Sequence, residues 1–403
     1  MTREREDLID KAVLPPPVNR LPPHARIAIV AGEASGDLLG SLLIDAVHQA
    51  NLADSFYGIA GSRMQAAGAK SLYPMDALSV RGYVEALGSL GKILAIRRDL
   101  RRRLLADPPQ LFVGVDAPDF NLALEARLKR AGISTVHFVS PSIWAWRARR
   151  IEKLRRATNH VLLVFPFEEA LFRQAGIPAT YVGHPLAHAL PERDRDGTRL
   201  RLQLPLEPEY VALLPGSRPS ELKAHGRLFI EAAKLLYARR PNLRFLVPIV
   251  NLPCRQSFEH ALAEADAYDL PIRMMFGHAH DALQAADAAL IASGTATLEA
   301  LLLDCPHVIT YRMPRLSYWL MRRQALQPWV GLPNILAQRT VVPEILQAAA
   351  TPEALMQALE ALLGNESARH AQTEEFEVQR TRLRRDTPRL IAQALQPFLG
   401  IRD

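Results

Sequence analysis

The sequence has few cysteines and no long apolar run, and these two absences exclude several classes of protein. Only Cys254 and Cys305 occur among 403 residues, and no CxxC pair is present. Two thiols cannot build a disulfide framework, so a reducing compartment without structural zinc is expected. No stretch of about 18 apolar residues occurs, so no membrane-spanning helix is predicted. Residues 1–24 are polar and proline-rich, lack the apolar centre of a secretory signal, and are predicted to form a flexible extension.

The overall composition is that of a globular protein with a basic surplus. Hydrophobic residues make up 49% and charged residues 23% of the chain, which is a normal balance for a folded protein. The length favours two domains over one. The formal net charge of +7 suggests an anionic partner, which could be a phosphate, a nucleic acid or a lipid headgroup. Charge alone does not decide among the three.

A repeated unit of short apolar run, turn and helical pattern extends through most of the chain. The runs are nearly continuous and rich in β-branched residues, as parallel strands covered by helices on both faces are. The first series comprises Arg26–Ala31, Ser55–Ile59, Leu111–Val115, Ser134–Val139, His160–Val164 and Thr180–Val182, and the second Val211–Leu214, Arg244–Val250, Ile272–Met275, Ala288–Ile291 and His307–Tyr311.

The fold class predicted from this pattern is α/β, with two doubly wound, Rossmann-like domains facing a central cleft. We expect the first domain at 25–190, a charged connection at 190–208, and the second domain at 209–367. Helices within 368–403 are expected to pack back across the junction.

Two turns of the first domain carry acidic residues. Gly32 is followed by Glu33 and Asp37, in a spacing that is not the GxGxxG fingerprint and with charges that would repel a pyrophosphate. Asp37 could equally cap the following helix. Asp116 ends an apolar run and is our candidate for a general base, whereas Asp119, three residues on, is expected to be a turn or capping residue.

Two turns of the second domain carry groups suited to a nucleotide. Ser217 and Arg218 stand between a strand and a proline-initiated helix, where amides and a guanidinium favour an anion such as pyrophosphate. Ser293, Gly294 and Thr295 offer amide and hydroxyl donors at a second strand end. Glu299 lies one helical turn later, where it could accept the hydroxyls of a ribose or simply be a solvated first-turn acid.

A basic stretch in the first domain could contact an anionic membrane. Apolar residues between 76 and 104 alternate with basic ones, and a further basic run follows Trp144 and Trp146. Such a stretch suits a bilayer surface or a phosphorylated acceptor, although a core-facing helix with a solvated basic face, or an RNA site, would look similar. The candidate surface residues are Lys92, Arg97, Arg98, Arg101, Arg102 and Arg147. His184 and His188 have the spacing of a helical metal pair, but no third ligand is evident, so neither a metal site nor any other cofactor is expected.

Read together, the turns resemble those of a known family. They match, in order and across residues 26–345, the lipid-A-disaccharide synthases, which form glycosyltransferase family 19. The matching segments are AGEASGD (31–37), GSRMQAAG (61–68), VGVDAPDFN (113–121), VSPSIWAWR (139–147), VGHPL (182–186), LLPGSR (213–218), ASGTATLE (292–299), YRM (311–313) and GLPNILA (331–337).

The resemblance implies an inverting, metal-independent transferase of the GT-B type. It implies UDP-2,3-diacylglucosamine as donor and 2,3-diacylglucosamine 1-phosphate (lipid X) as acceptor, a cytoplasmic location on the inner face of the inner membrane, and no nucleic-acid partner; a homo-oligomer stays possible. The family's important acid corresponds to Asp116, helped by Glu33. Arg218, Glu299 and Asn334 correspond to donor-binding positions. His188 departs from the family, where Asp is frequent.

Two rival functions remain compatible with the residues alone. A sugar-nucleotide epimerase or hydrolase on the same scaffold would share both nucleotide-type turns but would need no basic amphipathic stretch. A non-catalytic membrane- or RNA-binding protein would use the arginines but would leave Asp116 without a purpose. Acceptor-dependent release of UDP discriminates the transferase from both.

Overall fold

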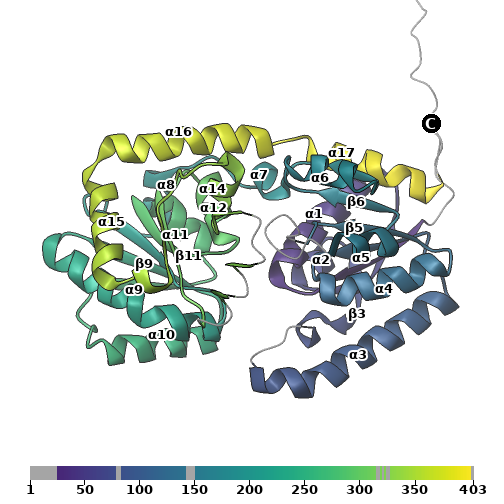
Figure 1. Ribbon diagram of the computed structural model, residues 1–403, viewed down its shortest axis with the longest axis horizontal. Helices are drawn as coiled ribbons and strands as arrows, with labels where there is room; N and C mark the ends of the chain where they lie inside the picture. Colours follow the sequence, from purple (N-terminus) through teal and green to yellow (C-terminus); the bar gives the residue numbers. More distant parts are fainter. Residues whose placement is uncertain are drawn as a thin grey trace, which may run out of the picture.

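The computed structural model describes residues 25–78, 83–141, 150–314, 318–319, 322–323 and 327–400 and contains two parallel sheets (Figure 1). The first sheet has seven strands in the order β3-β2-β1-β4-β5-β6-β7, and all of its pairings are parallel. Its strands are β1 (Arg26–Ala31), β2 (Ser55–Ala60), β3 (Ala69–Pro74), β4 (Leu111–Val115), β5 (Ser134–Phe138), β6 (His160–Leu163) and β7 (Ala179–Tyr181). Its helices are α1 (Ala34–Gln49), α2 (Ser62–Ala66), α3 (Tyr83–Ala106), α4 (Pro118–Arg130), α5 (Arg150–Ala157), α6 (Glu168–Gln174) and α7 (Pro185–Ala189).

The second sheet has six strands in the order β10-β9-β8-β11-β12-β13, again all parallel. Its strands are β8 (Tyr210–Leu214), β9 (Arg244–Ile249), β10 (Ile272–Phe276), β11 (Ala288–Ala292), β12 (His307–Tyr311) and β13 (Glu344–Leu346). Its helices include α8 (Arg195–Arg201), α9 (Pro219–Arg239), α10 (Leu252–Glu264), α11 (Ala279–Ala285), α12 (Ala296–Leu302), α14 (Leu332–Ala337) and α15 (Pro352–Gly364). The two doubly wound α/β domains expected from the sequence are confirmed.

The topology places the four motif turns at two equivalent positions. In the first sheet the strands β1 to β3 are added toward one edge and the strands β4 to β7 toward the other. The order of the strands therefore reverses between β1 and β4. In the second sheet the reversal falls at β8 and β11. Ligands of doubly wound folds bind beyond the carboxyl ends of the strands at such a switch point. The turns after β1, β4, β8 and β11 are those that carry Glu33, Asp116, Arg218 and Gly294.

The C-terminal helices join the two domains. Helix α16 (Glu366–Leu383) lies along the second domain, in contact with α12, α14 and α15, and α17 (Thr387–Leu395) packs on α1 of the first (Figure 1). At the crossing, the hydroxyl of Tyr181 donates to the carbonyl of Arg382 at 2.8 Å, and the amide of His184 donates to that of Leu383 at 3.0 Å. These bonds fix the last helices to the end of the first sheet.

The connection at 190–208 is more ordered than its charged sequence suggests. It contains α8, which packs on α11 of the second domain. Buried Arg199 donates to the carbonyls of Ala285 and Leu206 and to Asp287 at 2.7 Å, because a buried guanidinium needs acceptors for all its donors. The part of the chain that the structure describes contains no helix with the length and apolar character of a membrane span.

Candidate functional site

The turns after β1 and β4 are in direct contact because Gly32 has no side chain. A Cβ atom at Gly32 would lie 2.8 Å from the Cβ of Ala117, and one at Gly36 would lie 3.4 Å from the carbonyl oxygen of Val115. Only glycine allows the two turns to approach this closely. This packing brings Glu33, the residue before α1, next to the turn that carries Asp116.

Asp116 occupies a strained position at the end of β4. Asp116 and Ala117 have φ values of 50° and 43°, a left-handed conformation that non-glycine residues rarely adopt. The amide of Asp116 donates to Phe138 at 2.9 Å, and its carbonyl accepts from the side chain of Asn121 at 2.8 Å. Two successive residues in this region cost about 1–3 kcal/mol each unless the surroundings impose them, and such strain concentrates at functional sites.

The electrostatic surroundings of Asp116 suit a base. Burial raises the pKa of the Asp116 carboxyl, and the negative charge of Glu33 raises it further, whereas the charge of His137 and a hydrogen bond from Ala117 oppose the rise. A general base works best when its pKa lies nearer the operating pH than an ordinary carboxyl's does. The position of Asp116 therefore fits the role that the sequence suggested for it.

Behind Asp116 lies a buried pair that the sequence analysis missed. Glu125 of α4 and His137 of β5 are fully buried, with Oε1 2.7 Å from Nδ1. A Cβ atom at Gly114 would lie 2.1 Å from Glu125 Oε1 and 3.0 Å from the side chain of Asn121, so both side chains lie over that glycine. The pair thus stands directly beneath the turn that carries the candidate base. The available signal was the i, i+4 spacing of Asn121 and Glu125 on an apolar helix.

Asp37 has a structural role that differs from a cap of its own helix. It is buried, and its carboxylate accepts from the amides of Arg63 and Met64 at 3.0 and 3.1 Å. It therefore satisfies the first amides of α2 and not those of its own helix. Gly61 is required beside it, since a Cβ atom there would lie 2.4 Å from the carboxylate. This contact joins the segment AGEASGD (31–37) to the segment GSRM (61–64).

Arg218 links the two domains. Its Nη2 lies 3.0 Å from Oε2 and 3.3 Å from Oε1 of Glu33, and both side chains are more than half exposed. The carboxyl edges of the two sheets therefore face each other at this point. An exposed ion pair contributes only about 0–1 kcal/mol, so a ligand anion can readily replace Glu33 on the guanidinium.

The amide donors at the start of α9 are already used. Glu221 accepts from the amides of Ser217 and Arg218 at 2.9 and 3.3 Å, forming a capping interaction around Gly216, whose φ is 139°. A Cβ atom at Gly216 would lie 2.4 Å from Glu221. At this turn the guanidinium of Arg218 and the Ser217 hydroxyl are left for a ligand. The amides that were expected to donate to an anion donate to the Glu221 carboxylate instead.

The turn after β11 is more open. Gly294 and Thr295 are exposed, and a Cβ atom added to Gly294 would meet no atom within 4 Å. The hydroxyl of Ser293 donates to the carbonyl of Val330 at 2.9 Å, so it fixes the neighbouring loop. Glu299 lies 3.3 Å from Nε2 of His280, which comes from α11. Gly294, Thr295 and Glu299 thus remain candidates for donor contact, while Ser293 has a supporting role.

Asn334 has no free hydrogen-bonding group for a ligand. It is fully buried, and its amide nitrogen donates to Val342 and Glu344 at 2.8 Å. Its oxygen accepts from the amides of Val341 and Val342 at 2.7 and 2.9 Å. Four bonds are the most that its side-chain donors and acceptor commonly make. We therefore place Asn334 as a residue that shapes the loop beside Ser293, not as one that contacts the donor.

The expected membrane surface is described only in part. Arg147 lies outside the described residues. Lys92, Arg98 and Arg102 are exposed on α3, whereas Arg97 and Arg101 are half-buried against α4. Arg102 forms an ion pair with Asp99, which also binds Arg103 at 2.9 Å. The basic residues of α3 thus divide into a paired and an unpaired set.

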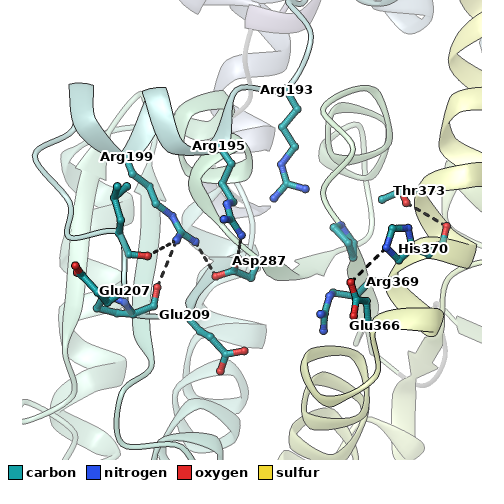
Figure 2. A pocket seen from close by; sticks show the side chains of 13 residues that line it. Arg193, Arg195, Arg199, Glu207, Glu209, Asp287, Glu366, Arg369, His370 and Thr373 are labelled. Atoms are coloured by element: carbon teal, nitrogen blue, oxygen red, sulfur yellow. Dashed lines mark hydrogen bonds and ion pairs between the residues drawn. The ribbon is translucent and has the colours of Figure 1, made fainter.

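One hollow lies away from all these turns. It encloses about 630 Å³ and is bordered by residues that precede β8, β11 and β12, at the amino edge of the second sheet (Figure 2). Its arginines are engaged: Arg195 pairs with Asp287 at 2.9 Å, and Arg193 donates to three carbonyls that include those of Gln284 and Asp304. These bonds anchor the interdomain connection to the second sheet.

The two histidines of GHPLAH are not a metal pair. Nδ1 of His184 accepts from the amide of Leu186 at 3.2 Å and so caps α7. Burial lowers the pKa of His184 to about 3, whereas His188 is exposed. Among the described residues, no group of three or more His, Cys, Asp and Glu side chains is placed to hold a metal ion.

Glu33→Gln is expected to move the acid limb of the pH–rate profile to lower pH. The charge of Glu33 raises the pKa of Asp116, so its removal lets Asp116 ionise at a lower pH. The measurement is kcat/KM against pH for the reaction that the resemblance implies. Asp45→Asn, which removes an exposed charge from α1, the helix that follows Glu33, is the matched control and leaves the limb in place. An unchanged or upward-shifted limb in Glu33→Gln would contradict the coupling.

Comparisons with known proteins agree with this geometry. The chain matches the family model described as lipid-A-disaccharide synthetase over residues 27–395. It is 52% identical to the lipid-A-disaccharide synthase of Aromatoleum aromaticum over 93% of this chain and 96% of that one, and 50% identical to that of Methylobacillus flagellatus over 93% and 99%.

Solved structures share the fold at much lower identity. The UDP-GlcNAc 2-epimerase of Neisseria meningitidis superposes with a TM-score of 0.64 at 12% identity, covering 92% of this chain and 100% of that one. MurG of Acinetobacter baumannii gives 0.55 at 16%, covering 92% and 99%. These likenesses show the two-domain GT-B fold. The motifs, the family model and the level of identity together place the chain in the lipid-A-disaccharide synthase family of glycosyltransferases.

Proposed function

We propose that this enzyme transfers 2,3-diacylglucosamine from UDP-2,3-diacylglucosamine to the 6-hydroxyl of 2,3-diacylglucosamine 1-phosphate. The products are the β-1,6-linked lipid A disaccharide 1-phosphate and UDP. The observation that carries this proposal is the ion pair between Glu33 and Arg218, because it joins the acidic turns of one domain to the nucleotide-type turns of the other. A transferase needs both in one site.

The proposed chemistry is a single displacement with inversion. The Asp116 carboxylate takes the proton of the acceptor's 6-hydroxyl, whose oxygen attacks the anomeric carbon from the face opposite UDP. The bond from that carbon to the diphosphate oxygen breaks, and its electron pair leaves with UDP. Asp116 can supply the base because burial and Glu33 raise the pKa of its carboxyl.

The positive charge of Arg218 offsets the charge that develops on the leaving UDP. Its planar guanidinium matches two phosphate oxygens at once, and the hydroxyl of Ser217 adds a donor on the same turn. Nη2 of that guanidinium lies 3.0 Å from Oε2 of Glu33. Donor binding would exchange one anion for another, which frees the Glu33 carboxylate beside Asp116 and the acceptor.

The open turn after β11 suits the rest of the nucleotide. Gly294 has no Cβ atom, and the space beside it is open. A phosphate or sugar can therefore approach the amides at Gly294 and Thr295. Glu299 stands on the first turn of the helix that follows, held by His280 at 3.3 Å. A carboxylate so placed can accept the two hydroxyls of a ribose.

We also propose that the reaction takes place at the inner face of the cytoplasmic membrane. Both proposed substrates carry acyl chains and therefore reside in a bilayer. Exposed basic residues on α3, together with Leu94 on its surface, suit the headgroup region of anionic lipids. The UDP portion of the donor would enter from the aqueous side between the domains.

Release of UDP is expected to depend on the acceptor. Purified enzyme is incubated with UDP-2,3-diacylglucosamine in mixed micelles, with and without lipid X, and UDP and the lipid products are followed by mass spectrometry. The expected product is a tetraacyl disaccharide monophosphate, formed in equal amount to UDP. UDP release without acceptor would indicate a hydrolase, and conversion of the donor sugar without UDP release would indicate an epimerase. Either result would overturn the proposal.

A further inference from the structure

Four arginines surround a small hollow between α3 and α4. Arg97, Arg98 and Arg101 come from α3 and Arg127 from α4, while Leu94, Ala123 and Leu124 complete the lining. The hollow encloses about 200 Å³, a size suited to one small group and not to an extended chain. We call this set of four arginines and their hollow the arginine pocket.

The arginine pocket holds unbalanced positive charge. The guanidinium groups of Arg98, Arg101 and Arg127 make no hydrogen bond or ion pair with any residue that the structure describes. Arg97 donates one bond, at 3.2 Å, to the carbonyl of Asp119, which is a neutral group. On another face of the same stretch of α3 the situation differs, since Asp99 binds both Arg102 and Arg103. The fold thus pairs one face of α3 and leaves the other unpaired.

The unpaired charges also interact with one another. Burial lowers the pKa of the Arg97 guanidinium, and the charge of Arg127 lowers it further, so the two cations repel across the hollow. Arg97 is held in place despite this, with its guanidinium carbon 6.0 Å from the ring centroid of Phe120. A protein that keeps like charges together around an empty space gains free energy when an anion enters it.

The position of the arginine pocket ties it to the proposed reaction. Asp119 and Phe120, which contact Arg97, follow Asp116 by three and four residues at the start of α4. Helix α3 runs along the lower edge of the first domain (Figure 1). Leu94, which is 40% exposed, stands at the rim and offers an apolar contact beside the charges.

Resting on the proposed membrane function, we propose that the arginine pocket binds the phosphate group of an anionic phospholipid at the bilayer surface. Guanidinium groups match phosphate oxygens bidentately, and they are less strongly hydrated than ammonium groups, so they suit a partly dry site. The exposed Leu94 would contact the glycerol and the first methylenes of the acyl chains. Occupancy would hold the catalytic turn at the depth where the substrates' sugars lie.

The test compares two double variants that remove the same charge from the same two helices. Arg101→Gln/Arg127→Gln removes two members of the arginine pocket, and Arg103→Gln/Arg130→Gln removes two arginines outside it. Binding of the full-length protein to phosphatidylcholine vesicles with and without phosphatidylglycerol is measured by co-sedimentation. The pocket variant is expected to lose roughly tenfold or more in affinity for the anionic vesicles, and the control variant only a few-fold. Equal losses in both would show a diffuse basic face and would overturn the proposal.

Two further measurements identify the ligand and separate this proposal from the catalytic one. Inorganic phosphate and single-stranded RNA are titrated against both variants, and a pocket-dependent loss for either of these, without a loss on vesicles, would overturn the lipid assignment. UDP release is assayed in detergent micelles, where no bilayer is present. The pocket variant is expected to keep its turnover there. If the unmodified enzyme releases no UDP, the proposed function fails while the vesicle result still stands.

Discussion

Asp116→Asn is expected to lower kcat for sugar transfer by about 10²–10⁴-fold, while the affinity for UDP changes little. The carboxamide has nearly the shape of the carboxylate but cannot accept a proton from the acceptor's hydroxyl, and loss of a general base costs this much. Single-turnover rates and UDP titration of the purified variant give the two quantities separately.

The local fold is expected to survive this substitution. The contacts that hold the turn are made by the backbone of Asp116, whose amide donates to Phe138 and whose carbonyl accepts from Asn121. Asn also tolerates the left-handed conformation that position 116 adopts at φ 50°. Removal of the buried charge relieves a desolvation cost, so the melting temperature of Asp116→Asn should not fall.

Asp119→Asn is the matched control, because it makes the same chemical change three residues along the same turn. Asp119 is exposed on the first turn of α4, and its backbone carbonyl, which Arg97 contacts, is retained. Transfer by this variant should stay close to that of the unmodified enzyme. Turnover near normal in Asp116→Asn, or an equal loss in Asp119→Asn, would contradict the assignment of the base to Asp116.

Strand positions were the most predictable part of the fold. Buried parallel strands are continuous apolar runs, and Arg26–Ala31, Leu111–Val115 and His307–Tyr311 begin and end as the sequence predicts. The two strands that were not predicted are both at sheet edges. β3 mixes polar and apolar residues, and only one of its six residues is buried, while β13 has only three residues. Edge strands lack the burial that produces the signal.

The turns of the site were predictable as positions but not as contacts. Glu33, Asp116, Arg218 and Gly294 follow strands, and the carboxyl ends of parallel strands meet at one edge, so the sequence could group them within each domain. It could not predict that Glu33 and Arg218 would touch, because their separation depends on how the domains are set against each other. Nor could it predict that Glu221 would occupy the amides at the start of α9.

Burial changed the interpretation of two other polar residues. Asn334 was grouped with the donor contacts, and the structure shows four bonds to its own loop instead. No sequence motif singles out Glu125 by itself, yet it pairs with His137 beneath the turn of Asp116. Both outcomes depend on which groups the folded chain brings against these side chains. The pair of Glu125 and His137 is expected to affect both the stability of the fold and the pKa of Asp116.

His137→Leu is expected to lower the free energy of unfolding by about 3–5 kcal/mol. It leaves the Glu125 carboxyl buried without the partner that lies 2.7 Å away, and removal of one member of a buried pair has a cost of this size. Burial raises the pKa of the Glu125 carboxyl, and the charge of His137 and the hydrogen bond with it oppose the rise. The stability that Glu125 contributes is then present below its ordinary pKa and is lost as the pH rises through its folded-state pKa. Denaturant unfolding at several pH values measures both effects.

Loss of His137 should also move the acid limb of the pH–rate profile upward, the opposite of the shift expected for Glu33→Gln. The charge of His137 opposes the rise in the pKa of Asp116, whereas that of Glu33 adds to it. Glu125→Leu and the double variant Glu125→Leu/His137→Leu complete a cycle for stability. Two apolar side chains of similar volume leave no unpaired group, so the double variant should lose at least about 1 kcal/mol less than the sum of the single losses. Additive losses would show that Glu125 and His137 do not stabilise each other. Limbs that shift in the same direction in His137→Leu and Glu33→Gln would show that the buried pair is not coupled to the turn of Asp116.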